Sequence, residues 1–273
     1  MTTENDPVFQ YLTGQLHETH AELLAGFERE SAAAVRTGQP TLDIPYGPHP
    51  RARFDHFAAE ASGATLVYLH AGYWQARDKA QFRFLAPAWV AAGVSVVLAN
   101  YPLCPDATLA ALTEAVRGLI PALGNTAGRI VVMGHSAGAH LAVELALTDW
   151  PTRGIARPPI AGIVGLSGIY DLAPLRATPL NDKLRLDAAE AHAASPLYRL
   201  RPGLPQALFA TGARETAAFH DQTAALVRAW TGAGNHATVM TVPDADHFSL
   251  LCQVCDPTAA LFDEIRALID AHA

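Results

Sequence analysis

From residue 64 onward, short apolar runs alternate along the chain with longer amphipathic stretches. The short runs have the length of buried strands, whereas the longer stretches repeat their apolar residues at helical spacing. We predict strands at residues 65–70, 95–99, 130–133, 160–166, 206–210 and 238–242. We predict helices at residues 80–92, 108–123, 137–148, 216–231 and 257–271. This alternation predicts an α/β fold in which helices flank a mostly parallel central sheet.

Three segments fall outside this alternation. Residues 1–36 form a predicted N-terminal helical segment that precedes the sheet and could cover a pocket. Residues 42–46 and 51–57 suit a leading hairpin at a sheet edge, because Gly and Pro separate them. Residues 167–205 contain five prolines, so we expect an irregular, cap-like insertion near the active face. Since no repeat or long polar linker divides the chain, we expect residues 1–273 to form a single domain.

The net charge of the chain indicates which kinds of partner it can bind. The chain carries 19 Lys and Arg against 26 Asp and Glu, which gives a formal net charge of -7. An acidic chain without a basic stripe lacks the charge that nucleic acid or an anionic membrane binds. We therefore expect a small-molecule substrate, no nucleic acid and no membrane, and we leave a homodimer open. The first residues carry Glu4 and Asp6 and no apolar run typical of a signal peptide, which favours a cytoplasmic protein.

The three cysteines are too few for a disulfide framework, which fits a reducing compartment. Cys252 and Cys255 form one CxxC pair, and no second pair of ligands accompanies it at the spacing of a zinc site. We therefore expect two buried thiols and no metal.

The strongest motif lies where an apolar strand meets an Ala-rich helix. Gly134, His135, Ser136, Ala137 and Gly138 form G-x-S-x-G in this context, which predicts a nucleophile elbow. The strand-to-helix turn is so tight that side chains at the two flanking positions would clash, which explains both glycines. The serine is then held at the helix N-terminus as the candidate nucleophile.

A second loop follows the predicted strand that ends at His70. In a fold with this elbow, the loop supplies one backbone N–H to the oxyanion, and the residue after the nucleophile supplies another. Gly72 and Ala137 are therefore the predicted oxyanion hole. Five neighbouring residues are predicted to line the substrate pocket: His70, Ala71, Tyr73, Trp74 and His135. The alternative for Tyr73 and Trp74 is that they are core aromatics.

A serine nucleophile needs a base and an acid, which follow it in the chain in the order acid, histidine. His247 lies after the last predicted strand and before the final helix, where the base belongs, whereas His272 lies at the end of the chain. Glu215 follows the preceding strand and is the first candidate acid. Two rivals remain open, Asp171 after the strand before that and Asp221.

These residues resemble the kynurenine formamidase (arylformamidase) branch of the α/β-hydrolases. That family has H-G-G-Y-W in the loop that here contains His70, Ala71, Gly72, Tyr73 and Trp74. The resemblance extends over nearly the whole chain. It includes residues 43–47, Phe54, Asp55, residues 100–105, 134–138 and 167–172, Pro174, Leu175, Asn181, Ser195, Pro196, residues 212–215 and Phe219.

The resemblance implies a cofactor-free serine hydrolase with Ser136 as nucleophile, His247 as base and Glu215 as acid. It further implies hydrolysis of an aryl formamide such as N-formyl-L-kynurenine to the arylamine and formate. A carboxylesterase for small aryl or acyl esters is the alternative, because the same triad serves both reactions. A non-catalytic binding protein is a third reading. Ala71 replaces the first glycine of the family loop, and a Cβ there costs energy if the residue needs a positive φ.

Overall fold

The fold is built on one eight-stranded sheet. The computed structural model describes residues 5–60, 62–124 and 128–271. Glu4 and His272 lie outside these residues. The strands are β1 (Thr41–Pro45), β2 (Arg53–Phe57), β3 (Ala64–Leu69), β4 (Ser95–Ala99), β5 (Arg129–His135), β6 (Ile160–Leu166), β7 (Gln206–Gly212) and β8 (Ala237–Val242). Their order across the sheet is β1-β2-β4-β3-β5-β6-β7-β8. Strands β4, β3 and β5 to β8 run parallel, whereas β2 pairs antiparallel with β1 and β4.

The sequence predictions for the sheet are confirmed. All six predicted strands are present, and β4 and β6 have the predicted bounds. The leading hairpin is present as β1 and β2, with the polar β1 at the edge. All six residues of β3 are buried, because helices cover both faces of the sheet.

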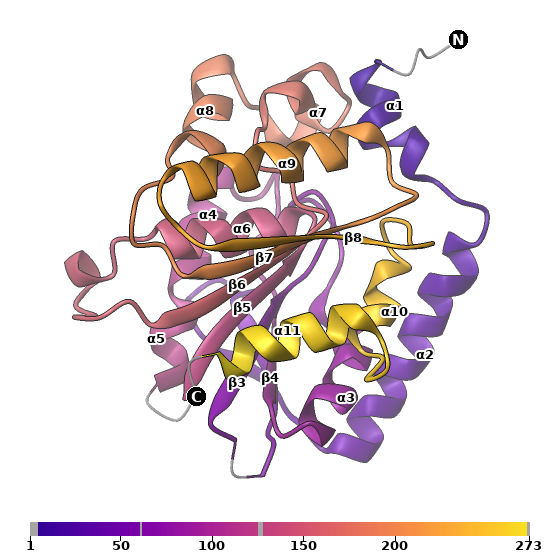
Figure 1. The fold of residues 1–273 in the computed structure, drawn as a ribbon, viewed down its shortest axis with the longest axis vertical. Helices are drawn as coiled ribbons and strands as arrows, with labels where there is room; N and C mark the ends of the chain where they lie inside the picture. Colours follow the sequence, from indigo (N-terminus) through magenta and orange to yellow (C-terminus); the bar gives the residue numbers. More distant parts are fainter. Residues whose placement is uncertain (1–4, 61, 125–127, 272–273) are drawn as a thin grey trace.

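Helices cover the sheet in two layers (Figure 1). One layer contains α4 (Leu109–Arg117), α5 (Leu119–Leu123), α6 (Ala137–Leu147) and α9 (Ala217–Gly232). The other contains α2 (His20–Gly38), the 3-10 helix η2 (Lys79–Leu85), α3 (Ala86–Ala91), α10 (Leu250–Val254) and α11 (Ala260–Asp270). Successive side chains of a strand point to opposite faces of the sheet. In β3, Val67 and Leu69 therefore pack against the first layer, and Leu66 and Tyr68 pack against the second.

Several predicted helix bounds are wrong, for local reasons. The predicted helix 80–92 is a 3-10 helix followed by α3, which carries Pro87 in its first turn, where a missing N–H is tolerated. The predicted helix 108–123 is divided at Gly118 into α4 and α5. The last helix begins at Ala260, and α10 before it was not predicted.

The two irregular segments contain short helices. The N-terminal segment consists of α1 (Pro7–Tyr11), the 3-10 helix η1 (Thr13–Gln15) and α2. The insertion is built from η5 (Ala173–Ala177), α7 (Asn181–Leu184), α8 (Ala188–Ala193) and η6 (Pro196–Tyr198). Pro174 and Pro196 lie in the first turns of η5 and η6. Prolines therefore limit helix length here without preventing helical turns.

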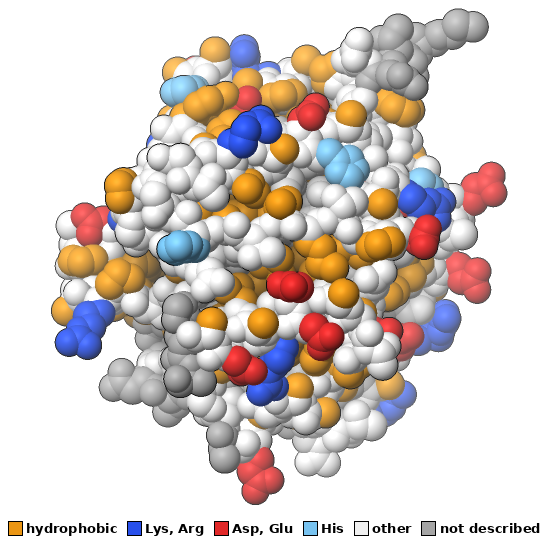
Figure 2. Space-filling view, viewed as in Figure 1, with side chains coloured by type: hydrophobic (Ala, Val, Ile, Leu, Met, Phe, Trp, Pro, Cys, Tyr) orange, Lys and Arg blue, Asp and Glu red, His pale blue; other side chains and the backbone are white. Residues whose placement is uncertain are grey.

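On the face of the molecule in Figure 2, basic and acidic side chains are scattered among one another. No helix in the described part of the chain is both long and apolar enough to cross a membrane.

Candidate active site

Ser136 lies in a strained turn between β5 and α6. Its φ is 55° and its ψ is -116°, a conformation that non-glycine residues rarely adopt. A Cβ on Gly134 would lie 2.0 Å from the carbonyl oxygen of Gly138, and one on Gly138 would lie 1.9 Å from that of Leu69. The structure therefore confirms why the motif requires both glycines. Ser136 is only 1% exposed, and its Oγ has no hydrogen-bond partner within the described residues.

The loops after β7 and β8 bring Glu215 and His247 together. Nδ1 of His247 lies 2.8 Å from Oε2 of Glu215, and both residues are buried. The other carboxylate oxygen, Oε1, accepts hydrogen bonds from the backbone N–H of Gly212 at 2.8 Å and from Oγ of Ser167 at 2.5 Å. Three donors thus fix the carboxylate. This arrangement orients the imidazole and leaves its Nε2 for another partner.

The imidazole of His247 lies beside the elbow. Its ring centroid is 4.7 Å from that of His135, the chain neighbour of Ser136. His135 is fully buried, and burial lowers its pKa well below the ordinary value. A neutral ring there adds no positive charge next to the candidate base.

The two rival acids are placed elsewhere. Asp171 accepts hydrogen bonds from the backbone N–H of Ala173 and from the hydroxyl of Tyr198. Asp221 is exposed on α9. The contact with His247 therefore favours Glu215.

The loop after β3 is held in an unusual backbone conformation. Gly72 has a φ of 121°, and Tyr73, Trp74 and Arg77 also have positive φ values. A Cβ on Gly72 would lie 2.3 Å from the carbonyl oxygen of Ala76, so only glycine fits. Ala71 is absent from the positive-φ residues and is accommodated without that strain. The expected backbone cost of alanine at position 71 is therefore wrong, because the strained positions begin one residue later.

Most of the predicted pocket residues are part of the core. His70, Ala71, Trp74 and His135 are each at most 1% exposed. The His70 ring stacks with those of Phe82 and Tyr101, and the Trp74 ring packs edge-on against His140. Ser136 and His247 are similarly buried, so burial does not decide whether these four residues line the pocket, and that role stays a prediction. Tyr73 alone of the five is partly exposed.

The N-terminal segment packs against the candidate site. The hydroxyl of Tyr73 donates to the carbonyl oxygen of Tyr11, and Nε2 of Gln222 on α9 donates to the hydroxyl of Tyr11. Gln15 contacts Thr216, next to Glu215, at 2.5 Å. From the insertion, the carbonyl oxygen of Leu180 accepts from Nε2 of Gln75 in the loop after β3. Both segments therefore contact the loops that carry the candidate residues.

Arg77 lies between the two loops that meet at the site and was missed from the sequence. Its Cγ lies 2.8 Å from the position of a Cβ on Gly72, and its Cζ lies 5.4 Å from the centroid of the Phe248 ring. No carboxylate of the described chain forms an ion pair with it within 4.0 Å. Burial lowers its pKa, and the more distant charge of Glu28 offsets part of this effect. Arg77 is therefore a partly buried cation that lacks a close anionic partner.

One expectation about the cysteines is wrong, and one group of possible metal ligands was not predicted. Cys252 is exposed and Cys255 partly buried, so they are not two buried thiols. One ligand atom each from His17, His20 and Asp246 lies within 4.8 Å of the others. The sequence contained this signal, because His17 and His20 have the H-x-x-H spacing of a chelating pair.

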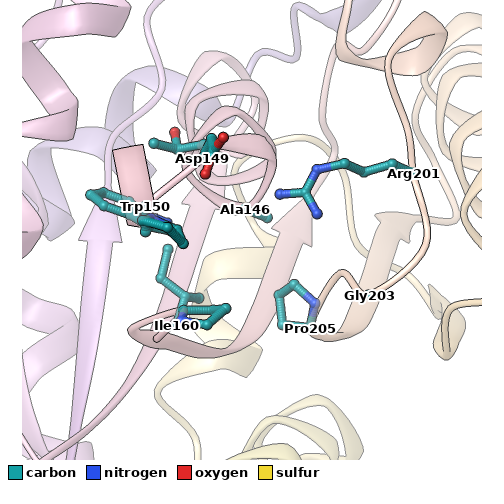
Figure 3. A pocket seen from close by; sticks show the side chains of 10 residues that line it. Ala146, Asp149, Trp150, Ile160, Arg201, Gly203 and Pro205 are labelled. Atoms are coloured by element: carbon teal, nitrogen blue, oxygen red, sulfur yellow. The ribbon is translucent and has the colours of Figure 1, made fainter. Parts of the chain in front are cut away.

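A hollow of about 380 Å³ lies near the starts of β6 and β7, at the opposite end of the strands from Ser136 (Figure 3). Trp150, Ile160 and Pro205 line it, together with the polar Asp149 and Arg201. It contains none of the candidate catalytic residues.

Comparison with known proteins identifies the family of the chain. Residues 66–251 match a family described as having the alpha/beta hydrolase fold. The chain is 31% identical to a kynurenine formamidase of Salmo salar over 248 residues, which covers 86% of this chain and 82% of the relative. It is 30% identical to an acetyl-hydrolase of Streptomyces hygroscopicus over 245 residues, covering 81% and 79%. The crystal structure of a putative thioesterase from Silicibacter sp. has a TM-score of 0.87 and 29% identity, covering 94% of this chain and 98% of that one.

Proposed function

Because the chain belongs to the α/β-hydrolase fold family and is a hydrolase, we propose that Ser136, His247 and Glu215 form its catalytic triad. The observation that carries the proposal is the 2.8 Å contact between His247 and a carboxylate whose other oxygen is already held by two donors. This contact directs the Nδ1 proton to Glu215 and leaves Nε2 to take the proton of Ser136.

In the proposed reaction, Oγ of Ser136 attacks the carbonyl carbon of the substrate while His247 accepts the hydroxyl proton. The backbone N–H groups of Gly72 and Ala137 stabilise the oxyanion, each typically contributing about 3 kcal/mol. The charged imidazole then protonates the leaving group, and the acyl group remains on Ser136. Water activated by His247 repeats the cycle and releases the acid.

We propose an aryl formamide carrying a carboxylate, such as N-formyl-L-kynurenine, as the substrate. The relatives named kynurenine formamidase support the formamide. An arylamine leaves more readily than an alkylamine because it is a weaker base, which suits this triad. Arg77 supports the carboxylate. Its cation lies over Phe248, whose ring packs edge-on against the His247 ring at 5.3 Å between centroids.

Two substrates that differ in charge test this proposal. N-formyl-L-kynurenine carries a carboxylate, whereas formanilide has the same scissile bond and none. Arg77→Gln should lower kcat/KM for N-formyl-L-kynurenine by about 10- to 100-fold, the value of one charge-assisted hydrogen bond, and leave formanilide unchanged. Arg228→Gln, an exposed change on α9, is the matched control. Equal losses on both substrates would assign Arg77 a purely structural role.

A carboxylesterase for small esters is the second candidate. The match to the acetyl-hydrolase covers 79% of that relative, nearly as much as the 82% covered in the formamidase of Salmo salar. Steady-state kinetics on p-nitrophenyl acetate beside N-formyl-L-kynurenine separates the two. Turnover of the ester alone by the wild-type enzyme would favour the esterase.

A further inference from the structure

Two imidazoles and a carboxylate converge beside the candidate base, where the mechanism proposed above does not use them. His17 lies between η1 and α2, and His20 is the first residue of α2. Asp246 precedes His247 in the loop after β8. Nε2 of His20 lies 3.3 Å from Oδ1 of Asp246, and the His17 and His20 ring centroids are 5.0 Å apart. The cluster thus joins the N-terminal segment to the loop of the base.

The imidazoles have an unused coordinating capacity. Nε2 of His17 and Nε2 of His20 are both buried; that of His20 has the contact with Asp246, whereas that of His17 has no hydrogen-bond partner within the described residues. Leaving a buried polar atom unpaired usually costs about 1 to 3 kcal/mol. A ligand that accepts a nitrogen lone pair would remove this cost.

The carboxylate of Asp246 is already oriented. It is 3% exposed, and its Oδ1 accepts hydrogen bonds from the backbone N–H groups of Phe248 at 3.0 Å and Ser249 at 2.9 Å. Hydrogen bonds of this kind fix the direction of metal-ligating carboxylates in other proteins. The same oxygen, Oδ1, is the one that lies 3.3 Å from Nε2 of His20.

We propose that His17, His20 and Asp246 form a binding site for a divalent transition metal ion, with Zn²⁺ the first choice. Two imidazoles and one carboxylate match the three-protein-ligand zinc sites, in which water takes the fourth position. With metal–ligand bonds near 2.1 Å, tetrahedral ligand atoms lie about 3.4 Å apart. The three atoms here lie within 4.8 Å, so closure requires shifts of about 1 Å. His17 lies in a connecting segment and can make such a shift.

The bound ion would fasten residues 17–20 to the loop that carries His247. The same N-terminal segment already contacts the loop after β3 through Tyr11 and the start of α9 through Gln15. A third attachment would hold the N-terminal segment against the loops after β3, β7 and β8. The expected consequence is a metal-dependent gain in thermal stability.

Calorimetric titration of EDTA-dialysed protein with Zn²⁺ tests the site. One ion per chain should bind to the wild type. His17→Gln should weaken binding at least tenfold and abolish the Zn²⁺-dependent rise in Tm, whereas exposed His236→Gln should change neither. Because His17 is only partly buried, the variant should fold, which circular dichroism checks.

The competing ligands in the chain are Cys252 and Cys255. The Cys252→Ser, Cys255→Ser double variant should bind Zn²⁺ as the wild type does. Absence of binding to the wild type, binding unaffected by His17→Gln, or binding lost in the cysteine variant would each overturn the proposal.

Discussion

Replacing Glu215 by Gln tests the acid of the candidate triad most directly. The carboxylate accepts from three donors: the backbone N–H of Gly212, Oγ of Ser167 and Nδ1 of His247. An amide has one oxygen and one NH₂ group and cannot accept at both ends. If its oxygen faces Gly212 and Ser167, its NH₂ faces His247. The imidazole must then carry its proton on Nε2, where it cannot take the proton of Ser136.

The cost of the wrong tautomer is large. In a serine protease, the corresponding acid-to-amide change lowers kcat about 10⁴-fold, which corresponds to about 5.4 kcal/mol at about 1.36 kcal/mol per factor of ten. The alternative amide orientation keeps the His247 contact but sets NH₂ against the N–H of Gly212. That orientation costs stability, because it leaves a buried donor without an acceptor. We therefore expect kcat to fall by three to four orders of magnitude with KM little changed.

Initial rates on N-formyl-L-kynurenine and p-nitrophenyl acetate measure the effect. The matched control is Asp171→Asn, which removes the same charge from a carboxylate bound to Tyr198 instead of His247. It should reduce kcat less than tenfold. A larger loss in Asp171→Asn than in Glu215→Gln would refute the assignment of the acid.

Three further results are expected. Ser136→Ala should lower kcat about a million-fold and keep the Tm of the wild type, because Oγ has no hydrogen-bond partner in the described structure; turnover near the wild-type rate would remove Ser136 as nucleophile. Burial lowers the pKa of His70 to about 4, so the unfolded chain binds its proton first as pH falls from 6.5. Denaturant titrations should therefore show a loss of about 2 kcal/mol between pH 7.5 and 5 from this residue, and a shallower slope in His70→Gln. Ala71→Gly should lower stability by about 0.5 to 1 kcal/mol without raising kcat/KM, since Ala71 avoids positive φ; rates on formyl, acetyl and butyryl substrates check this, and a gain confined to the formyl substrate would contradict it.

The sheet could be predicted because its strands are short apolar runs that helices cover on both faces. Residues 95–99 and 160–166 were predicted with the bounds they have as β4 and β6, since a polar residue, Asn100 or Ser167, follows each apolar run in the sequence. The division of residues 108–123 at Gly118 was missed, because the apolar spacing continues through it. Pro121 has no N–H for the carbonyl oxygen of Arg117, the last residue of α4, and its ring crowds that carbonyl, which accounts for the break.

The loops of the site could be predicted from chain order, whereas side-chain burial could not. Parallel strands end at one edge of a sheet, so the loops after β5, β7 and β8 had to meet, whatever the helices between them. Trp74 is different. Its burial depends on His140 of α6, and the local pattern beside Gly72 is the same for a pocket residue and for a core residue.

The closed form of the site follows from contacts between distant parts of the chain. Ser136, His247 and Glu215 are each at most 7% exposed. The partly exposed residues near them include Gly72, Tyr73, Arg77, Thr216 and Phe248. Tyr73 is held by Tyr11, 62 positions earlier, and Gln15 reaches Thr216 across 201 positions. No periodicity in a single segment encodes such pairs. The loop after β3 is thus held by the N-terminal segment through Tyr11 and by the insertion through Leu180, so we expect substrate entry past Tyr73 to require a shift of one of these two contacts.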